Sequence, residues 1–297
     1  MDIEDNFFDV GGDSITAANL VIRIREEFGR EISPSEFLRC PSVSRLAHLI
    51  RDSRKSRRAH GLLPLKDGTS RLPLFFIAPA LFDLLTYKDL IQHIETGQAV
   101  YGMEGYEELL SSSVEETASR YIDQILSRFT SGPFALIGFS SGGVIAFEMA
   151  LQLHAMHIEV PFLAMLDSSC PVYLTKKTPW WRPAIIAEFL RNLPLWLYYY
   201  GADKKYIKAF VRNRISEKLN LPAIEGEDPG YQFHDLMKKI NGWLRNYQPG
   251  HYPGRIVYYK ARGQGLFRPL IRDKGWRHFA DRVDACSIPG THNQMLL

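Results

Sequence analysis

The feature that most constrains the fold is an alternation, from residue 72 onwards, between short apolar runs and longer amphipathic stretches. A short, continuously apolar run is typical of a strand buried on both faces. Strands that alternate with helices predict a mostly parallel sheet with helices on both of its faces. The apolar runs are LPLFFIAPA (72–80), AVYGMEG (99–105), FALIGFS (134–140), EVPFLAMLD (159–167), GRIVYYKAR (254–262) and VDACSIPG (283–290).

The helical pattern is clear in residues 114–129, between two of these runs. Its apolar residues share one face of a helix: Ala118, Tyr121, Ile122, Ile125 and Phe129. Residues 171–250 break the alternation, because they are rich in Trp, Tyr and Leu at helical spacing and contain no strand-like run. An insertion of this size on the ligand side of a sheet predicts a helical lid, with a larger helical core as the alternative.

The first 52 residues form a different unit. After Ser14 apolar residues recur at helical spacing, and Gly29 is a natural stop for that helix. Residues 33–50 then read as two short helices separated by a proline. We therefore expect a small all-α unit over residues 1–52, which is near the lower size limit for independent folding.

Residues 53–71 are polar and basic, and we expect them to link the small unit to a second unit over residues 72–297. The basic run from Arg51 to Arg58 is typical of a solvated linker. The formal net charge of the 297-residue chain is only +3, so the sequence does not indicate a nucleic-acid partner.

The composition indicates a soluble globular protein, with 45% hydrophobic and 23% charged residues. Cys40, Cys170 and Cys286 are odd in number and far apart, which predicts neither a disulfide framework nor a metal site and fits a cytoplasmic, reducing compartment. The N-terminus has no hydrophobic signal segment. Residues 180–200 are the most apolar stretch, but charged residues and prolines interrupt them, so we expect no membrane span.

The strongest chemical motif is GFSSG, residues 138–142, which matches G-x-S-x-G. It follows a predicted strand and precedes a predicted helix, the context in which this motif forms a strained turn that exposes a nucleophilic serine. Ser140 is at the apex, and Ser141 is the rival hydroxyl. The backbone N–H of Ser141 is better placed to stabilise an oxyanion.

A serine nucleophile needs a base and an acid that orients the base. His292 lies just past the last predicted strand, so it fits the chain order Ser…Asp…His of an α/β-hydrolase. Asp167 ends the strand EVPFLAMLD and should point into the ligand crevice, whereas the alternative, Asp273, lies eleven residues beyond a later strand.

A second oxyanion donor should come from the turn after the first strand, IAPAL (77–81). Proline has no N–H, so the donor is expected to be Ala80 or Leu81.

With these motifs in view, the chain resembles two families. Residues 3–50, with DNFFDVGGDSITAANL, resemble a peptidyl carrier (thiolation) domain of nonribosomal peptide synthetases. Residues 72–297 resemble a type I thioesterase domain of the same synthetases. The matching pieces are PLFFIAPA, VYGMEG, GFSSGG, MLDSS, NYQPGHYPGRIVYYKAR and IPGTHNQML.

The resemblance implies that Ser14 carries covalent 4′-phosphopantetheine. It also implies a triad of Ser140, Asp167 and His292, a helical lid, and a four-helix carrier whose first helix precedes residue 1. The thioesterase family continues with a helix after its histidine, whereas this sequence stops five residues past His292, so both ends look shortened. Leu81 stands where the thioesterase family has a flexible glycine, which predicts a narrower pocket. The implied partners are upstream synthetase modules, a phosphopantetheinyl transferase and a peptidyl thioester substrate.

The expected activity is terminal release of a peptidyl or polyketide–peptide chain from the carrier through an ester on Ser140. Hydrolysis and macrocyclisation both remain open. The alternatives are an editing thioesterase or esterase, and an inactive carrier–hydrolase interaction module.

Overall fold

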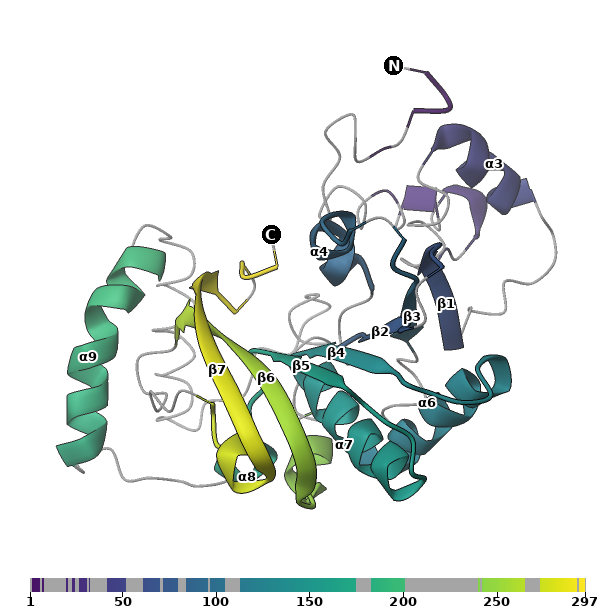
Figure 1. Cartoon of the computed structure of the whole chain (residues 1–297). Helices are drawn as coiled ribbons and strands as arrows, with labels where there is room; N and C mark the ends of the chain where they lie inside the picture. The colour runs from purple at the N-terminus through teal and green to yellow at the C-terminus, as the bar shows by residue number, and fades with distance from the viewer. Residues whose placement is uncertain are drawn as a thin grey trace.

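The parallel sheet predicted by the alternating pattern is present in the computed structural model (Figure 1). The structure describes residues 2–5, 7, 20, 23–24, 27–30, 32, 42–51, 61–69, 72–79, 84–95, 97–104, 113–174, 183–200, 240, 242–264, 273–292 and 294–296. The sheet has seven strands in the order β1-β3-β2-β4-β5-β6-β7, and all neighbouring pairs are parallel except β1 with β3. The strands are β1 (Gly61–Lys66), β2 (Leu74–Ile77), β3 (Val100–Glu104), β4 (Ala135–Phe139), β5 (Phe162–Leu166), β6 (Tyr252–Gly263) and β7 (Ala280–Thr291).

The central strands are buried on both faces, which explains why they read as continuous apolar runs. In β2, Phe75 and Ile77 join the core under α6 (Val114–Arg128) and α7 (Ser141–Ala155), while Phe76 joins a second core on the other face. Figure 1 shows α6 and α7 on the lower side of the sheet and the short helix α4 (Lys88–Gln92) on the upper side. Chain segments far apart in sequence thus enclose one sheet.

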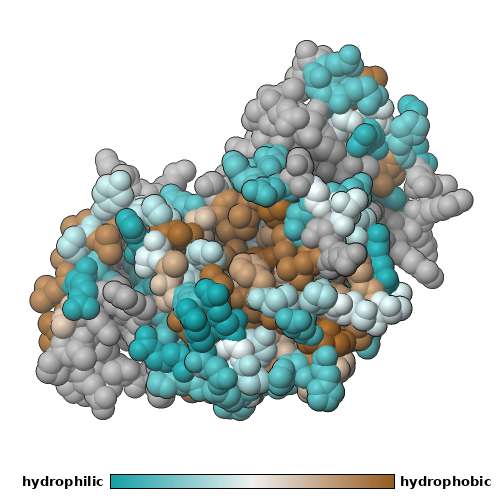
Figure 2. Space-filling view, viewed as in Figure 1, coloured by the Kyte–Doolittle hydropathy of each residue, from teal (hydrophilic) through white to brown (hydrophobic). Residues whose placement is uncertain are grey.

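The second core extends to the end of the chain. Met295 and Leu296 pack against it together with Ile91 and Ile94, and the 3₁₀ helix η1 (Leu84–Tyr87) contributes Leu84 and Tyr87 to it. Figure 2 shows apolar residues gathered in the middle of this view, below α4 and the C-terminal segment, with polar residues around them. This apolar surface lies on the side of the sheet opposite α6 and α7.

The helix predicted over residues 114–129 is confirmed as α6. It begins with a capping box, in which the Ser113 hydroxyl accepts the Glu116 N–H and the Glu116 carboxylate accepts the Ser113 N–H, both at 3.1 Å. The expected face is buried, including Tyr121, Ile122 and Ile125. The local pattern therefore specified both the start of this helix and its orientation.

One expectation is wrong: residues 53–71 are not all linker. Residues 61–66 form β1, an edge strand that pairs antiparallel with β3 and buries Leu63. Pro64 lies within it, and a proline is tolerated in a strand only at an edge or a bulge. The register shifts between Pro64 and Lys66, which identifies such an irregularity. A proline in a short run hid this strand in the sequence.

The N-terminal unit is described in part. Residues 20, 23–24 and 27–28 are helical, and Gly29 adopts φ +63° immediately after them, as expected of a helix stop. The second of the two short helices is α3 (Val43–Arg51), and Leu46 on it forms a buried cluster with Ile24 and Ile32. Ser14 and residues 33–40 lie outside the described residues.

The described parts of residues 171–246 are helical, and residues 247–250 lead to β6 without regular structure. The helical parts comprise α8 (Pro171–Leu174), α9 (Pro183–Tyr200) and residues 240 and 242–246. Figure 1 shows α9 beyond β7, at the side of the sheet. In the part of the chain that the structure describes, no helix is long and apolar enough to cross a membrane.

Candidate active site

Ser140 occupies a sharp turn between β4 and α7. Its backbone has φ 54° and ψ −121°, an uncommon conformation for a residue with a side chain. The Ser140 N–H donates to the Leu166 carbonyl at 2.9 Å, and the Ser140 carbonyl accepts from the Gly143 N–H at 3.2 Å. These bonds hold the strained residue between the end of β5 and the first turn of α7.

The glycines around Ser140 allow backbones to approach one another closely. A Cβ atom at Gly138 would lie 2.3 Å from the Gly142 carbonyl oxygen, and one at Gly142 would lie 2.3 Å from the Ile77 carbonyl oxygen. Both contacts are with backbone atoms, so no side chain can turn away to relieve them. The glycines of GFSSG are therefore required by packing at the turn, as the motif predicts.

His292 follows β7 and lies beside Ser140. Its Nε2 is 3.1 Å from the Ser140 Oγ. The imidazole stacks on the Phe139 ring with 4.6 Å between centroids and 27° between planes. The His292 side chain is 37% exposed, so it can contact both the serine and a molecule that enters from solvent.

Asp167 lies behind His292 and is shielded from solvent. Its Oδ2 is 2.7 Å from the His292 Nδ1, and its side chain is 1% exposed. The residue follows β5 directly and has φ 47°. Its N–H donates to the Tyr259 carbonyl on β6 at 2.7 Å, which anchors the turn to the neighbouring strand. The three side chains predicted as a triad thus form one hydrogen-bonded row.

The other carboxylate oxygen of Asp167 is surrounded by donors. Oδ1 accepts from the Ala261 N–H at 3.2 Å and the Gln264 Nε2 at 3.3 Å, and it lies 2.8 Å from the Lys274 Nζ. Burial raises the pKa of the Asp167 carboxyl, but the hydrogen bond with His292 and the charge of Lys274 lower it by more, so the pKa lies below its usual range. Asp167 is therefore ionised at neutral pH.

Sequence reasoning missed Gln264 and Lys274. Lys274 is 107 positions from Asp167 and belongs to a turn with no recognisable motif. The alternative acid, Asp273, is its neighbour, but the Asp273 carboxylate accepts from the Gly275 N–H at 3.0 Å and the Arg277 Nε at 2.5 Å. The geometry favours Asp167 over Asp273 as the partner of His292.

Sequence reasoning also missed Tyr87, which joins the end of β2 to the end of β4, next to Ser140. Its buried hydroxyl donates to the Ile77 carbonyl at 2.6 Å and accepts from the Phe139 N–H at 2.7 Å. Burial raises the pKa of Tyr87, so the hydroxyl keeps its proton and can serve both partners. This contact spans 52 residues from Tyr87 to Phe139, and no local pattern indicates it.

The expected oxyanion donors are described in part. Ser141 is the first residue of α7 and is buried beside the nucleophile. The Ala78 N–H donates to the Met103 carbonyl at 2.9 Å, so it is already used within the sheet. Ala80 and Leu81 lie outside the described residues.

The helix α9 contacts the segment that carries the histidine. The Tyr199 hydroxyl accepts from the Gly290 N–H at 3.2 Å, two residues before His292. A Cβ atom at Gly263 would lie 3.0 Å from the Tyr199 ring, so the ring also packs closely on the end of β6. The end of α9 is thus joined to both strands that flank the site.

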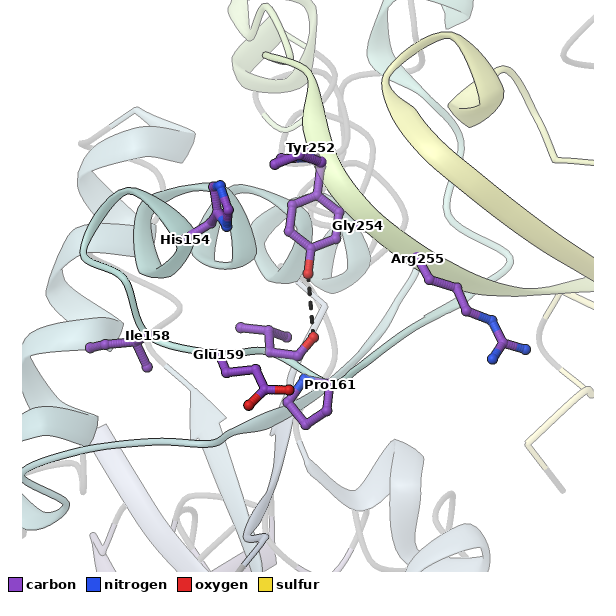
Figure 3. A pocket seen from close by; sticks show the side chains of 9 residues that line it. His154, Ile158, Glu159, Pro161, Tyr252, Gly254 and Arg255 are labelled. Carbon is purple, nitrogen blue, oxygen red and sulfur yellow. Dashed lines mark hydrogen bonds between the residues drawn. The ribbon is translucent and has the colours of Figure 1, made fainter.

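A cavity of about 280 Å³ lies where β5 and β6 begin, at the opposite end of these strands from the triad (Figure 3). Residues 158–161 before β5, residues 252–255 at the start of β6, and His154 near the end of α7 line it. The Tyr252 hydroxyl donates to the Val160 carbonyl at 3.3 Å across this cavity. It contains none of the three triad residues, so it is not part of this site.

Among the described residues, no group of three or more His, Cys, Asp or Glu side chains is arranged to hold a metal ion. The Asp167 Oδ2 is paired with the His292 Nδ1, and the His292 Nε2 is paired with the Ser140 Oγ. The arrangement is suited to transferring a proton from the serine hydroxyl.

Two family models match this chain. The family model for thioesterase domains matches residues 73–224, and the model for the phosphopantetheine attachment site matches residues 1–50. A dimodular nonribosomal peptide synthase of Bacillus subtilis (strain 168) is 36% identical over 170 residues, 56% of this chain and 7% of that protein. Malpibaldin synthetase of Mortierella alpina is 26% identical over 303 residues, 98% of this chain and 5% of that protein.

Solved structures share the fold. A crystal structure of a four-domain nonribosomal peptide synthetase, bound to AMP and glycine, aligns with a TM-score of 0.60 and 22% identity over 99% of this chain and 23% of that one. The NocB thioesterase domain, in covalent complex with a fluorophosphonate nocardicin G analogue, aligns with a TM-score of 0.52 and 21% identity over 77% of this chain and 88% of that one.

The chain spans only a small fraction of the synthetases that it matches. Its sheet is that of an α/β-hydrolase, and its N-terminal residues match the domain to which 4′-phosphopantetheine is covalently attached. The chain belongs to the thioesterase domain family, as a thioesterase enzyme preceded by a phosphopantetheine carrier in one didomain.

Proposed function

We propose that this didomain releases a peptidyl or polyketide–peptide chain from a thioester on its own carrier, through an ester on Ser140. The observation that carries the proposal is the row Ser140–His292–Asp167, with 3.1 Å between Oγ and Nε2 and 2.7 Å between Nδ1 and Oδ2. These distances are within hydrogen-bond reach, as a serine nucleophile and its base require.

In the first half-reaction, His292 Nε2 accepts the proton of Ser140 while the Oγ attacks the thioester carbonyl carbon. Asp167 accepts the hydrogen bond from Nδ1–H, holds this tautomer and stabilises the imidazolium. When the tetrahedral intermediate collapses, the carbon–sulfur bond breaks, the thiol leaves with the proton from His292, and the acyl group remains on Ser140.

In the second half-reaction, His292 removes a proton from the nucleophile that attacks the ester. Water yields a linear acid, and an amine or hydroxyl of the same chain yields a macrocycle. The ester bond to Oγ then breaks and Ser140 regains its proton from His292. Both products use the same residues, so the row of side chains supports release without selecting between them.

We propose the Ser141 N–H and the N–H of Ala80 or Leu81 as oxyanion donors. The position of Ser141 at the start of α7 supports this role, because backbone N–H groups at a helix N-terminus favour negative charge. One such donor contributes about 3 kcal/mol of transition-state stabilisation in other serine hydrolases.

The proposed organisation is a four-helix-type carrier over residues 1–52, a linker ending before residue 61, and the hydrolase from there to residue 297. Residues 171–250 are proposed as its lid. The contact of Tyr199 with Gly290 supports this, because a movement of α9 would act on the backbone two residues before His292. Upstream synthetase modules are the proposed source of the acyl chain.

Ser14 is the proposed attachment point of 4′-phosphopantetheine, which supplies the thioester when it is bound. The match of residues 1–50 to the attachment-site model supports this assignment. Incubating the full chain with a phosphopantetheinyl transferase and coenzyme A should add the mass of one arm, and Ser14→Ala should abolish that gain. A gain in Ser14→Ala would place the arm elsewhere.

A fluorophosphonate probe tests the nucleophile. It should label the full chain once, and peptide mapping should find the adduct on Ser140. Ser140→Ala should not label, whereas the matched control Ser141→Ala should. Labelling of Ser140→Ala, or no labelling of the folded wild type, would contradict the assignment and favour an inactive module.

A further inference from the structure

The triad acid has a cation beside it that the proposed mechanism does not use. The Lys274 Nζ lies 2.8 Å from the Asp167 Oδ1 and also donates to the Asp167 backbone carbonyl at 3.2 Å. The Lys274 side chain is only 11% exposed. The same ammonium therefore holds both the carboxylate and the backbone of Asp167.

The turn around Lys274 is built to present this side chain. Lys274 has φ 45°, in the left-handed region, and Gly275 follows with φ 99°. The Lys274 carbonyl accepts the Cys170 N–H at 3.3 Å, which ties the turn to the segment that follows Asp167. A residue with a long side chain in a left-handed conformation is strained, so the surrounding contacts must stabilise it.

The other charged or titratable groups that the structure describes near Asp167 do not duplicate this role. Burial, together with the charges of Asp167 and Asp273, raises the pKa of Tyr258 on β6, so its hydroxyl is neutral. Asp273 is paired with Arg277, and Cys170 is a buried thiol. Among the described residues, Lys274 is the cation in contact with the Asp167 carboxylate.

The charge of Asp167 thus acts on two partners at once, Lys274 at Oδ1 and His292 at Oδ2. An isolated carboxylate strongly favours the protonated imidazolium beside it. A carboxylate already paired with an ammonium is close to neutral as a unit, so it favours the imidazolium less.

We infer that Lys274 is a positioning residue that sets the basicity of His292. By offsetting the charge of Asp167, it lets the imidazole accept the Ser140 proton at a lower pH than an uncompensated aspartate would allow. The inference rests on the proposed function, because it takes His292 as the base. If Lys274 only held Asp167 in place, replacing it would lower the maximal rate or the stability of the fold, and the pH dependence of the rate would not move.

The rate of inactivation of the full chain by a fluorophosphonate, measured against pH, separates these roles. The rate should fall at low pH as His292 becomes protonated, and this falling part of the pH profile is its acid limb. In Lys274→Met the acid limb should move to higher pH by about one unit or more. At a pH well below the limb, the inactivation rate of this variant should therefore be about tenfold lower than that of the wild type. Lys274→Arg should keep the wild-type limb. The matched control Arg277→Met, which removes a cation from Asp273 instead, should leave it unchanged.

Lys274→Gln separates charge from hydrogen bonding, because the amide still donates to Asp167. It should move the limb upwards as Lys274→Met does. An unmoved limb in both neutral variants, or loss of the folded state in both by thermal unfolding, would overturn the inference and leave Lys274 as a structural clamp. If the wild type does not react with the probe, the proposed function itself fails, and the two failures are therefore distinguishable.

Discussion

Two buried aspartates in this hydrolase share their chemistry but differ in what they do with it. Asp167 and Asp273 are each 2% exposed over the whole residue, and each pairs with a cation, Lys274 or Arg277. Both carboxylate oxygens of Asp273 accept hydrogen bonds within its own turn, from the Gly275 N–H and from Arg277. Asp167 directs one oxygen at His292 from the end of β5. The role of a buried carboxylate is thus decided by where its second oxygen points.

The largest expected effect comes from Asp167→Asn. The amide keeps the shape but removes the charge and disfavours the tautomer of His292 that accepts the serine proton. We expect kcat/KM for a small acyl thioester to fall by about 10³- to 10⁴-fold, as for other serine hydrolases. A loss below tenfold in a folded variant would remove Asp167 from the triad.

Asp273→Asn is the matched change in the other turn, and its effect should be on stability. Arg277 would face an amide in place of a carboxylate, and the turn before the buried Trp276 would weaken. We expect the free energy of unfolding to fall by about 1–3 kcal/mol, measured by urea denaturation. The kcat/KM of the folded variant should stay within a few-fold of wild type, and a loss as large as that of Asp167→Asn would erase the contrast.

A smaller effect should appear in acid. The pKa of folded Asp167 is lowered, so its ionisation stabilises the fold above the unfolded pKa of about 3.9. This contribution should be lost as the pH falls through the folded pKa. In urea titrations between about pH 3 and 7 followed by tryptophan fluorescence, Asp167→Asn should show a shallower decline than wild type. Equal slopes would mean that Asp167 contributes nothing to acid sensitivity.

The parts of the molecule that could be predicted from sequence are those written in local pattern. Doubly buried strands read as apolar runs, the capping box starts α6 where the pattern places it, and the glycines of GFSSG match backbone contacts at the turn. The juxtaposition of Ser140, Asp167 and His292 was expected from strand ends and chain order, because parallel strands bring their carboxyl ends to one edge.

What sequence reasoning missed depends on contacts between distant segments. Lys274 reaches Asp167 across 107 residues, and Tyr87 joins Ile77 to Phe139. Neither residue type carries a motif at its position, so only the folded backbone brings these partners together. β1 was missed for another reason: an edge strand tolerates Pro64, which in a sequence reads as a break.

The smallest expected effect is that of Arg277→Met, and it sharpens the comparison. The Arg277 side chain is 59% exposed, so its ion pair with Asp273 is largely open to solvent, where such pairs contribute about 0–1 kcal/mol. Asp273 keeps the Gly275 N–H as a partner in this variant. We expect the free energy of unfolding to fall by less than about 1 kcal/mol in urea denaturation, with kcat/KM unchanged. If Arg277→Met lowered activity as strongly as Lys274→Met, exposure would not be what separates the two cations, and the long-range charge of the whole turn would have to act on His292.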